Sequence, residues 1–218
     1  MKTSYLQFPF ALALLFSNAL ADSHQRILID NFASGNLNQW TVQSFAGTTD
    51  YQIISLDKQP ALRAVSHASA SGLLKQQKID LLQTPFLNWQ WRIENTLGKI
   101  NEQSQSGDDY SARIYVILDG GWTFWKTRAI NYVWASNSPK DSRWPNAFAG
   151  HHAMMLAIRS RQDKSTTWYQ EKRNIIEDFK ALHGIDIRYI DAIAIMTDTD
   201  NAGGNATAYY GNIYFSAQ

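Results

Sequence analysis

The stretch YSARIYVILDGGWTFWKTRAINYVW, Tyr110–Trp134, decides the fold expected of this chain. Apolar and polar residues alternate on both sides of Asp119-Gly120-Gly121, which is typical of a tight turn between two antiparallel strands. A two-residue turn at Gly120-Gly121 pairs Leu118 with Thr123 and, further along, Arg113 with Arg128. Directly opposed residues share a face, so this register divides the hairpin into two faces. A slip of one residue would exchange them.

One face of this predicted hairpin is apolar and belongs in a core: Ala112, Ile114, Val116, Leu118, Trp125, Ala129 and Val133. The other is aromatic and basic: Arg113, Tyr115, Phe124, Lys126, Arg128, Tyr132 and Trp134. Arg113 opposite Arg128 is an unfavourable like-charge pair unless an anion lies between them. That anion is either a neighbouring acid (Asp108, Asp109 or Asp198) or a carboxylate, sulfate or phosphate of a ligand, which the planar guanidinium group fits well.

The same alternation recurs along the rest of the chain in short segments bounded by Gly, Asn, Asp and Ser. In Phe86–Glu94, every second residue is a Trp or Ile, as expected of a half-buried strand. Only Ile175–Leu182 has helical spacing, and Gly184 follows it as a stop signal. The other predicted strands are Arg26–Phe32, Tyr51–Leu56, Ala61–Val65, Leu73–Asp80, His152–Ser160, Trp168–Asn174, Ile190–Thr197 and Thr207–Phe215. We therefore expect an all-β, two-sheet antiparallel β-sandwich of the jelly-roll type with one short helix.

Residues 1–21 have the pattern of a secretory signal peptide. Lys2 is followed by the apolar run Leu6–Phe16 and by a small-x-small cleavage site that ends at Ala21. The run is shorter than the roughly 20 residues that span a bilayer, and a buried N-terminal helix is the alternative interpretation. We expect cleavage after Ala21, a single domain over residues 22–218, no integral membrane segment after cleavage, and a location in the periplasm or outside the cell.

Composition excludes several classes of function. The chain has 218 residues and no Cys, which rules out disulfides, Cys nucleophiles and thiolate zinc sites. Loss of the signal peptide removes Lys2 alone and leaves basic and acidic residues equal in number. No basic run supplies the positive field that a nucleic-acid-binding protein needs, so nucleic acid is not an expected partner. The oligomeric state is left open.

An acidic segment follows the apolar run that ends at Met196. Asp198, Asp200 and Asn201 precede paired glycines and offer the hard oxygen ligands typical of a calcium loop, although an ordinary Asx-rich turn is the alternative. The segment is no EF-hand, because Tyr209 stands where the bidentate Glu belongs. The same acids could work as a catalytic pair, with Asp109 as a third candidate. Two residues apart on a strand, Asp198 and Asp200 would lie about 6.5–7 Å apart, a separation compatible with glycoside hydrolysis.

Two further expectations concern loops and aromatic residues. The polar segment Gly98–Gly107 is predicted to be an exposed excursion that serves as a mobile lid. Most Trp residues are expected in the core, whereas Trp122, Trp134 and Trp144 are candidates for a sugar-stacking surface.

Five short sequence motifs occur together and in order: GDDYSAR (Gly107–Arg113), RAINYVWAS (Arg128–Ser136), EKRN (Glu171–Asn174), MTDTDNAGG (Met196–Gly204) and AYYGNIYF (Ala208–Phe215). With them the chain resembles an uncharacterised family of secreted bacterial proteins, the domain of unknown function three-zero-four-seven (DUF3047). The family pattern ends in Tyr-Tyr-Gly-Asp, where this chain has Asn212. If that acid is a cation ligand in the family, Asn212 keeps an oxygen but loses the charge.

The start of the chain carries a second resemblance. Asp30-Asn31-Phe32 is similar to the opening of carbohydrate-binding jelly rolls of the galactose-binding type. That resemblance implies a structural calcium between the first and last strands, but fold does not dictate function.

Together these features favour a secreted glycan-binding module for a saccharide, with an acidic saccharide among the candidate ligands. The expected ligand-binding residues are Arg113, Tyr115, Arg128, Tyr132 and Trp134. The alternatives are a polysaccharide-active enzyme, hydrolase or lyase, that uses Asp109, Asp198 and Asp200, or a structural envelope protein without a small ligand.

Overall fold

The computed structural model describes residues 25–121 and 126–218. The predicted signal peptide lies outside the described residues, as do Trp122, Phe124 and Trp125. The strands are β1 (Arg26–Asp30), β2 (Thr41–Ala46), β3 (Asp50–Leu56), β4 (Gln59–His67), β5 (Ala70–Asp80), β6 (Phe86–Ile93), β7 (Tyr110–Leu118), β8 (Arg128–Trp134), β9 (Arg143–Asn146), β10 (Gly150–Arg159), β11 (Tyr169–Asn174), β12 (Tyr189–Asp198) and β13 (Asn205–Ser216). The described helices are α1 (Ile175–His183) and a 3₁₀ turn at Gln105–Gly107.

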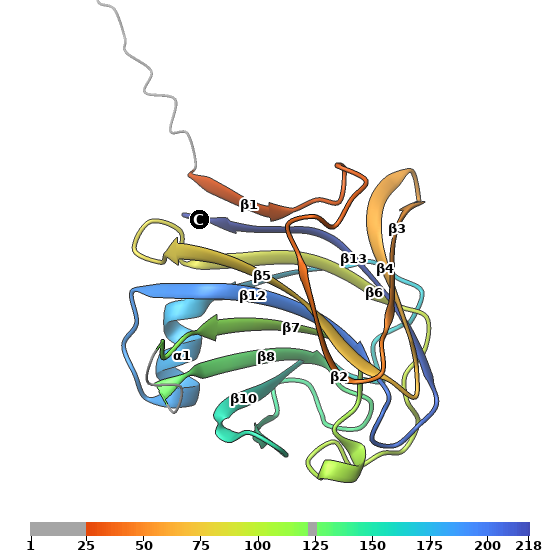
Figure 1. Cartoon of the computed structure of the whole chain (residues 1–218). Helices are drawn as coiled ribbons and strands as arrows, with labels where there is room; N and C mark the ends of the chain where they lie inside the picture. Colours follow the sequence, from red (N-terminus) through yellow and green to blue (C-terminus); the bar gives the residue numbers. More distant parts are fainter. Residues whose placement is uncertain (1–24, 122–125) are drawn as a thin grey trace, which may run out of the picture.

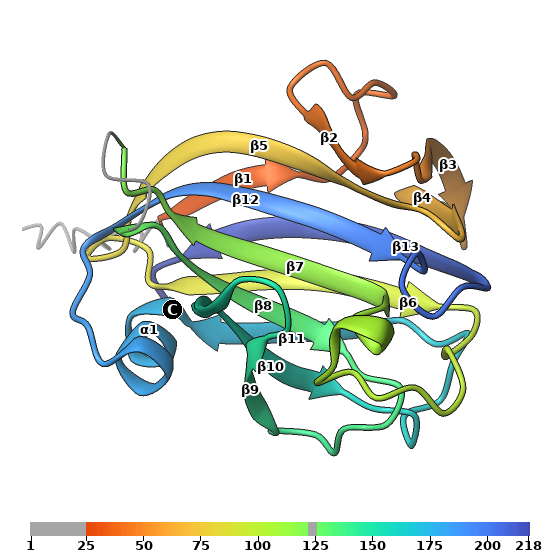
Figure 2. The same cartoon turned by 60° about the horizontal axis from the view of Figure 1, so that its bottom comes forward.

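These strands form two sheets that pack face to face (Figures 1 and 2). One has the order β11-β6-β13-β4-β3, with β1 paired to β13, and the other has the order β2-β5-β12-β7-β8-β10-β9. The predicted all-β sandwich with one short α-helix is therefore confirmed. One strand pair departs from the expected antiparallel arrangement: β10 lies parallel to β8, because the chain crosses to the sheet edge through β9 before it returns.

The core lies between the sheets and is rich in aromatic residues. Trp89 and Trp91 of β6 are fully buried, as the alternation predicts. Trp89 stacks on Tyr132 of β8 with ring centroids 5.2 Å apart, and Trp91 lies 5.8 Å from Trp134. Offset and tilted ring pairs add to the free energy gained from area burial, so these contacts join the two sheets firmly.

Helix α1 closes one end of the sandwich (Figure 2). The Asn174 side chain accepts hydrogen bonds from the backbone N–H groups of Ile176 and Glu177, which caps the N-terminus. Gly184 ends the helix in the left-handed region at φ 70°, where a residue without Cβ is favoured. Phe179 is fully buried among the core residues. The predicted short helix and its stop are thus confirmed. Within residues 25–121 and 126–218, no helix has the length and apolar character to cross a membrane.

The predicted register of the β7–β8 hairpin is wrong. Leu118 pairs with Arg128, Val116 with Ile130, and Arg113 with Val133. The two registers differ by an odd number of residues, so the faces of β8 are exchanged relative to those of β7. Arg113 therefore points away from the core, while Arg128 lies on the opposite face of the sheet. The connection between the strands is also longer than the two-residue turn that we assumed.

Candidate functional site

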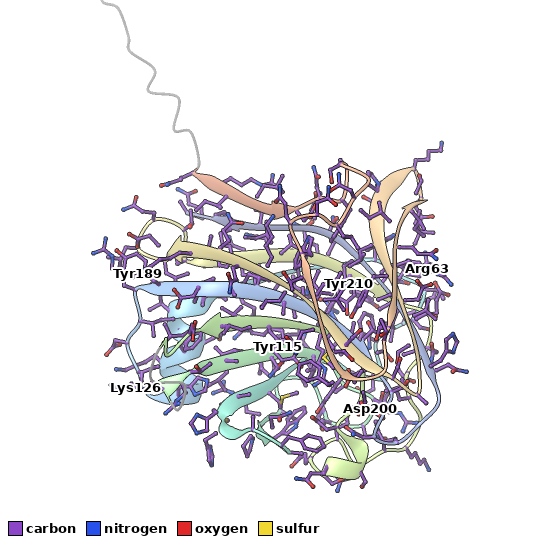
Figure 3. The ribbon with its side chains drawn as sticks, in the orientation of Figure 1. Arg63, Tyr115, Lys126, Tyr189, Asp200 and Tyr210 are labelled. Carbon is purple, nitrogen blue, oxygen red and sulfur yellow. The ribbon has the colours of Figure 1, made fainter. Side chains whose placement is uncertain are left out.

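A cleft of about 490 Å³ lies on the outer face of the seven-stranded sheet. Arg113 and Tyr115 of β7, Asn131 of β8 and Met196 of β12 form its floor, because alternate residues of these strands point away from the core. Figure 3 shows Tyr115 over the middle of the sheet, and Asp200 nearer the end where β12 leaves it. The cleft thus extends from the sheet surface to the acidic loop after β12.

Arg113 is held by Asp198 in a buried, bidentate ion pair. The Arg113 Nε donates to Asp198 Oδ1 at 2.8 Å, and its Nη2 donates to Asp198 Oδ2. The exposed fractions of the two side chains are 4% and 1%. Nη2 also donates to the Asp108 backbone carbonyl at 3.3 Å. The protein itself therefore balances the positive charge of Arg113.

Asn131 is a buried polar residue of the cleft whose side chain has no partner. It is 1% exposed, and neither its Oδ1 nor its Nδ2 has a hydrogen bond with the described residues. Its cross-strand neighbour is Tyr115, whose hydroxyl donates only to the weakly accepting Met196 Sδ at 3.4 Å. An unsatisfied buried polar group costs about 1–3 kcal/mol, so native proteins rarely keep one without a function.

Asp108 adds a second atom without a partner. Its Oδ2 accepts a hydrogen bond from Asn146 Nδ2 at 2.8 Å, whereas its Oδ1 has no donor within the described chain. Burial raises the pKa of Asp108 above its ordinary value, although the nearby Arg113 opposes this rise. Burial and the Asp109 charge also raise the pKa of Asp200, which lines the same cleft. The cleft is consequently a site where negative charge is already costly.

Two exposed phenylalanines stand at opposite sides of the cleft. Phe45 of β2 is 67% exposed. Phe148, in the segment that connects β9 to β10, is 57% exposed. β2 and β9 lie at opposite edges of the sheet. Sequence reasoning missed both rings and also Asn131, because no pattern distinguishes an exposed Phe in a polar segment from a core Phe.

Asp109, Asp198 and Asp200 gather at the end of β12, as expected, and one ligand atom of each lies within 4.8 Å of the others. Such a cluster could hold a metal. Protein donors already contact most of these oxygens: Asp109 accepts hydrogen bonds from the backbone N–H groups of Asn201, at 3.1 Å, and Ala202, at 2.6 Å. Asp200 accepts one from the Asn201 side chain at 3.1 Å. Asp198 and Asp200 line the cleft, whereas Asp109 does not.

The structure brings together only two of the five expected ligand-binding residues, Arg113 and Tyr115. Tyr132 and Trp134 are fully buried between the sheets, since they lie on the exchanged face of β8. Tyr132 donates to Asp178 Oδ2 at 2.6 Å, and Trp134 Nε1 donates to the Ser160 carbonyl at 3.1 Å. Neither ring has a free face for a ligand.

Arg128 lies elsewhere, beside His152, whose Nδ1 is 2.8 Å from Arg128 Nη1. The expected clamp of Arg113 and Arg128 on one face is therefore wrong. Trp144 is only 3% exposed and packs in a small second core, so it offers no stacking surface either.

The segment Gly98–Gly107 is largely exposed, as expected, but Glu102 anchors it to the segment that follows β8. Glu102 is 1% exposed, and its carboxylate accepts hydrogen bonds from three successive backbone N–H groups, those of Ser136, Asn137 and Ser138. The Asn137 side chain donates back to the carbonyls of Gly98 and Ile100. Sequence reasoning treated Glu102 as one of several polar residues, although it holds the loop in place.

The fold is similar to those of several solved structures. A family 11 carbohydrate-binding module from Clostridium thermocellum, in complex with a β-1,3-1,4-mixed-linked tetrasaccharide, is 12% identical, with a TM-score of 0.47 over 87% of this chain and 94% of that one. A family 30 carbohydrate-binding module of a cellulosomal cellulase from the same organism is 10% identical, with a TM-score of 0.48 over 83% of this chain and 92% of that one.

The xyloglucanase domain of NopAA from Sinorhizobium fredii, in complex with cellobiose, is 11% identical, with a TM-score of 0.45 over 81% of this chain and 92% of that one. At such values the likeness assigns no ligand to this chain. No curated protein matches the sequence. The model of the family described as "Protein of unknown function (DUF3047)" matches residues 38–214, and the chain therefore belongs to this family.

Proposed function

We propose that the protein is a glycan-binding module and that the cleft on the seven-stranded sheet holds the saccharide. The observation that carries this proposal is the Asn131 side chain, which is buried in the cleft floor and has no partner for its donor or its acceptor. A sugar hydroxyl can donate and accept, so a pair of hydroxyls would satisfy both ends of the amide.

The rest of the cleft agrees with this ligand. Its volume of about 490 Å³ falls within the usual range for small-molecule sites, which are concave and largely apolar with a few convergent polar groups. Phe45 and Phe148 offer ring faces on which the C–H face of a sugar can pack. Tyr115 supplies a hydroxyl group that only a thioether now accepts.

The test is retention on insoluble polysaccharides and titration calorimetry with soluble ones, with the wild type and two cleft variants. We expect Asn131→Ala and Phe148→Ala to bind at least about tenfold more weakly, a loss of about 1.4 kcal/mol. Asn131→Ala should melt at or above the wild-type temperature, because it removes an unsatisfied polar group. Leu82→Ala, which removes a 62% exposed side chain away from the cleft, should bind like the wild type.

No retention on any polysaccharide would overturn the proposal and leave a structural envelope protein without a small ligand. Cleft variants that bind as tightly as the wild type would place the saccharide elsewhere.

The described contacts favour binding over catalysis. Of the three candidate catalytic acids, Asp198 is held by Arg113, and Asp109 is held by two backbone N–H groups. A hydrolase or lyase would release new reducing ends from the polysaccharide that binds, and Asp200→Asn would abolish this release. Reducing-end assays on the same polysaccharides therefore decide between the two functions.

We also propose that the chain is exported. The support is the signal-peptide pattern of residues 1–21, which ends in Ala19-Leu20-Ala21. Protein recovered from the periplasm or the medium should begin at Asp22 on N-terminal sequencing. Retention of residues 1–21 on cytoplasmic protein would contradict this proposal.

Calcium is the further ligand that we propose, held by Asp198, Asp200 and Asn201 with Asp109 beside them. Its support is the proximity of the three carboxylates, together with the preference of calcium for carboxylate and amide oxygens.

A further inference from the structure

We propose that the cleft selects uncharged saccharides and rejects those that carry a carboxylate or sulfate on the bound sugar. This inference rests on the proposed saccharide binding and specifies its substrate class. It reverses the expectation of an acidic ligand, which depended on two arginines lying side by side.

The charges that line the cleft favour an uncharged ligand. Among the described residues, Arg113 is the one Lys or Arg side chain that lines it, and it is bound at two points by Asp198. Asp108, whose Oδ2 also lies 3.9 Å from Arg113 Nη1, and Asp200 line the same cleft, so three carboxylates face this one cation. Apart from the balanced pair, the cleft therefore has an excess of negative charge, and an anionic sugar would meet repulsion in a partly buried site.

The atoms that lack hydrogen-bond partners also favour an uncharged sugar. Asn131 offers one free donor group and one free acceptor, and Asp108 Oδ1 is a further free acceptor. A hydroxyl group satisfies each of these atoms, because it donates and accepts through the same oxygen. A carboxylate or sulfate has only acceptors, so it would satisfy the Asn131 Nδ2 group and leave Asn131 Oδ1 and Asp108 Oδ1 without donors.

The experiment compares one polysaccharide with its own acidic derivative. The neutral polysaccharide that the protein retains most strongly is oxidised at its C6 hydroxyls to carboxylates, and both forms are titrated in EDTA so that no cation bridges the acids. We expect the oxidised form to bind at least about tenfold more weakly. The double variant Asp108→Asn, Asp200→Asn should reduce this difference to threefold or less.

Asp186→Asn is the matched control, because it removes a carboxylate that pairs with Lys180 outside the cleft. This variant should keep the full difference. A thermal melt of each variant confirms that it is folded. Equal or tighter binding of the oxidised form would overturn the inference and leave saccharide binding intact. A difference that persists in the double variant would overturn the role given to the Asp108 and Asp200 charges in this selection. Binding of neither form would overturn the proposed function itself.

Discussion

Arg113 is a buried cation whose charge is balanced by the protein instead of by solvent. Taking a guanidinium group and a carboxylate out of water is expensive, and their attraction offsets this cost only when the geometry is good and the remaining hydrogen bonds are made. Both conditions hold here, because Arg113 donates twice to Asp198 and once more to the Asp108 carbonyl. The pair is thus a vulnerable point of the fold as well as the floor of the cleft.

Asp198→Asn should lower the free energy of unfolding by about 3–5 kcal/mol, because the change leaves the Arg113 charge buried without its main partner. Urea denaturation followed by tryptophan fluorescence measures this. The control is Asp186→Asn, which breaks the exposed 2.7 Å pair with Lys180 and should cost at most about 1 kcal/mol. Equal, small losses in both variants would show that Asp108 or water replaces Asp198.

At the scale of elements, α1 is docked to the end of the seven-stranded sheet through His183. The His183 Nε2 lies 3.0 Å from the Ala129 carbonyl of β8, and its ring stacks on Phe179. Burial lowers the pKa of His183 below its ordinary value of 6.5, and the nearby charges of Arg128, His151 and His152 lower it further, although the hydrogen bond to Ala129 opposes the shift. The folded protein therefore prefers the neutral ring.

This preference predicts a pH dependence of stability. Between the ordinary pKa and the lower folded pKa, the unfolded chain binds more protons, so the free energy of unfolding falls as the pH falls. His183→Gln, which keeps a donor for Ala129, should flatten this fall in urea titrations from about pH 7.5 to about pH 5. Leu82→Ala, which changes an exposed side chain that does not titrate, should leave the slope unchanged. A slope that is the same in all three proteins would refute this role of His183.

The elements that were predictable are those with one clearly apolar face. β7 alternates cleanly, so the outward direction of Arg113 and Tyr115 could be foreseen. β8 is apolar at nearly every position, and its Ile130, Tyr132 and Trp134 compete with Ala129 and Val133 for the core. The three larger side chains lie in the core between the sheets, whereas the prediction placed Ala129 and Val133 there. β2 and β9 were missed because β2 is exposed along most of its length and β9 is a four-residue strand with a proline.

The cleft itself could not have been predicted. Its key residues, Phe45, Asn131 and Phe148, come from segments far apart in the chain. The two rings matter because they are exposed, and Asn131 matters because its side chain lacks hydrogen-bond partners. No local pattern encodes a missing hydrogen-bond partner, because partners are set by tertiary packing.

At the scale of the whole molecule, a bound calcium ion would connect the ends of β7 and β12. If the acidic cluster holds one, it stabilises the folded state by mass action, since the unfolded chain has no preformed site. We expect the melting temperature of the protein to fall in EDTA and to recover with added calcium, and this recovery to be lost in Asp200→Asn. A melting temperature that EDTA leaves unchanged would contradict calcium binding.

The parallel pairing of β8 with β10 has a consequence for how the cleft can be altered. It requires a connection that passes around the sheet edge, and that connection carries Phe148 to the cleft. Insertions or deletions at positions 147–149 would therefore reshape the ligand site, while the strands of both sheets keep their neighbours. Loop libraries at these three positions should yield variants with new sugar preferences that fold as readily as the parent protein.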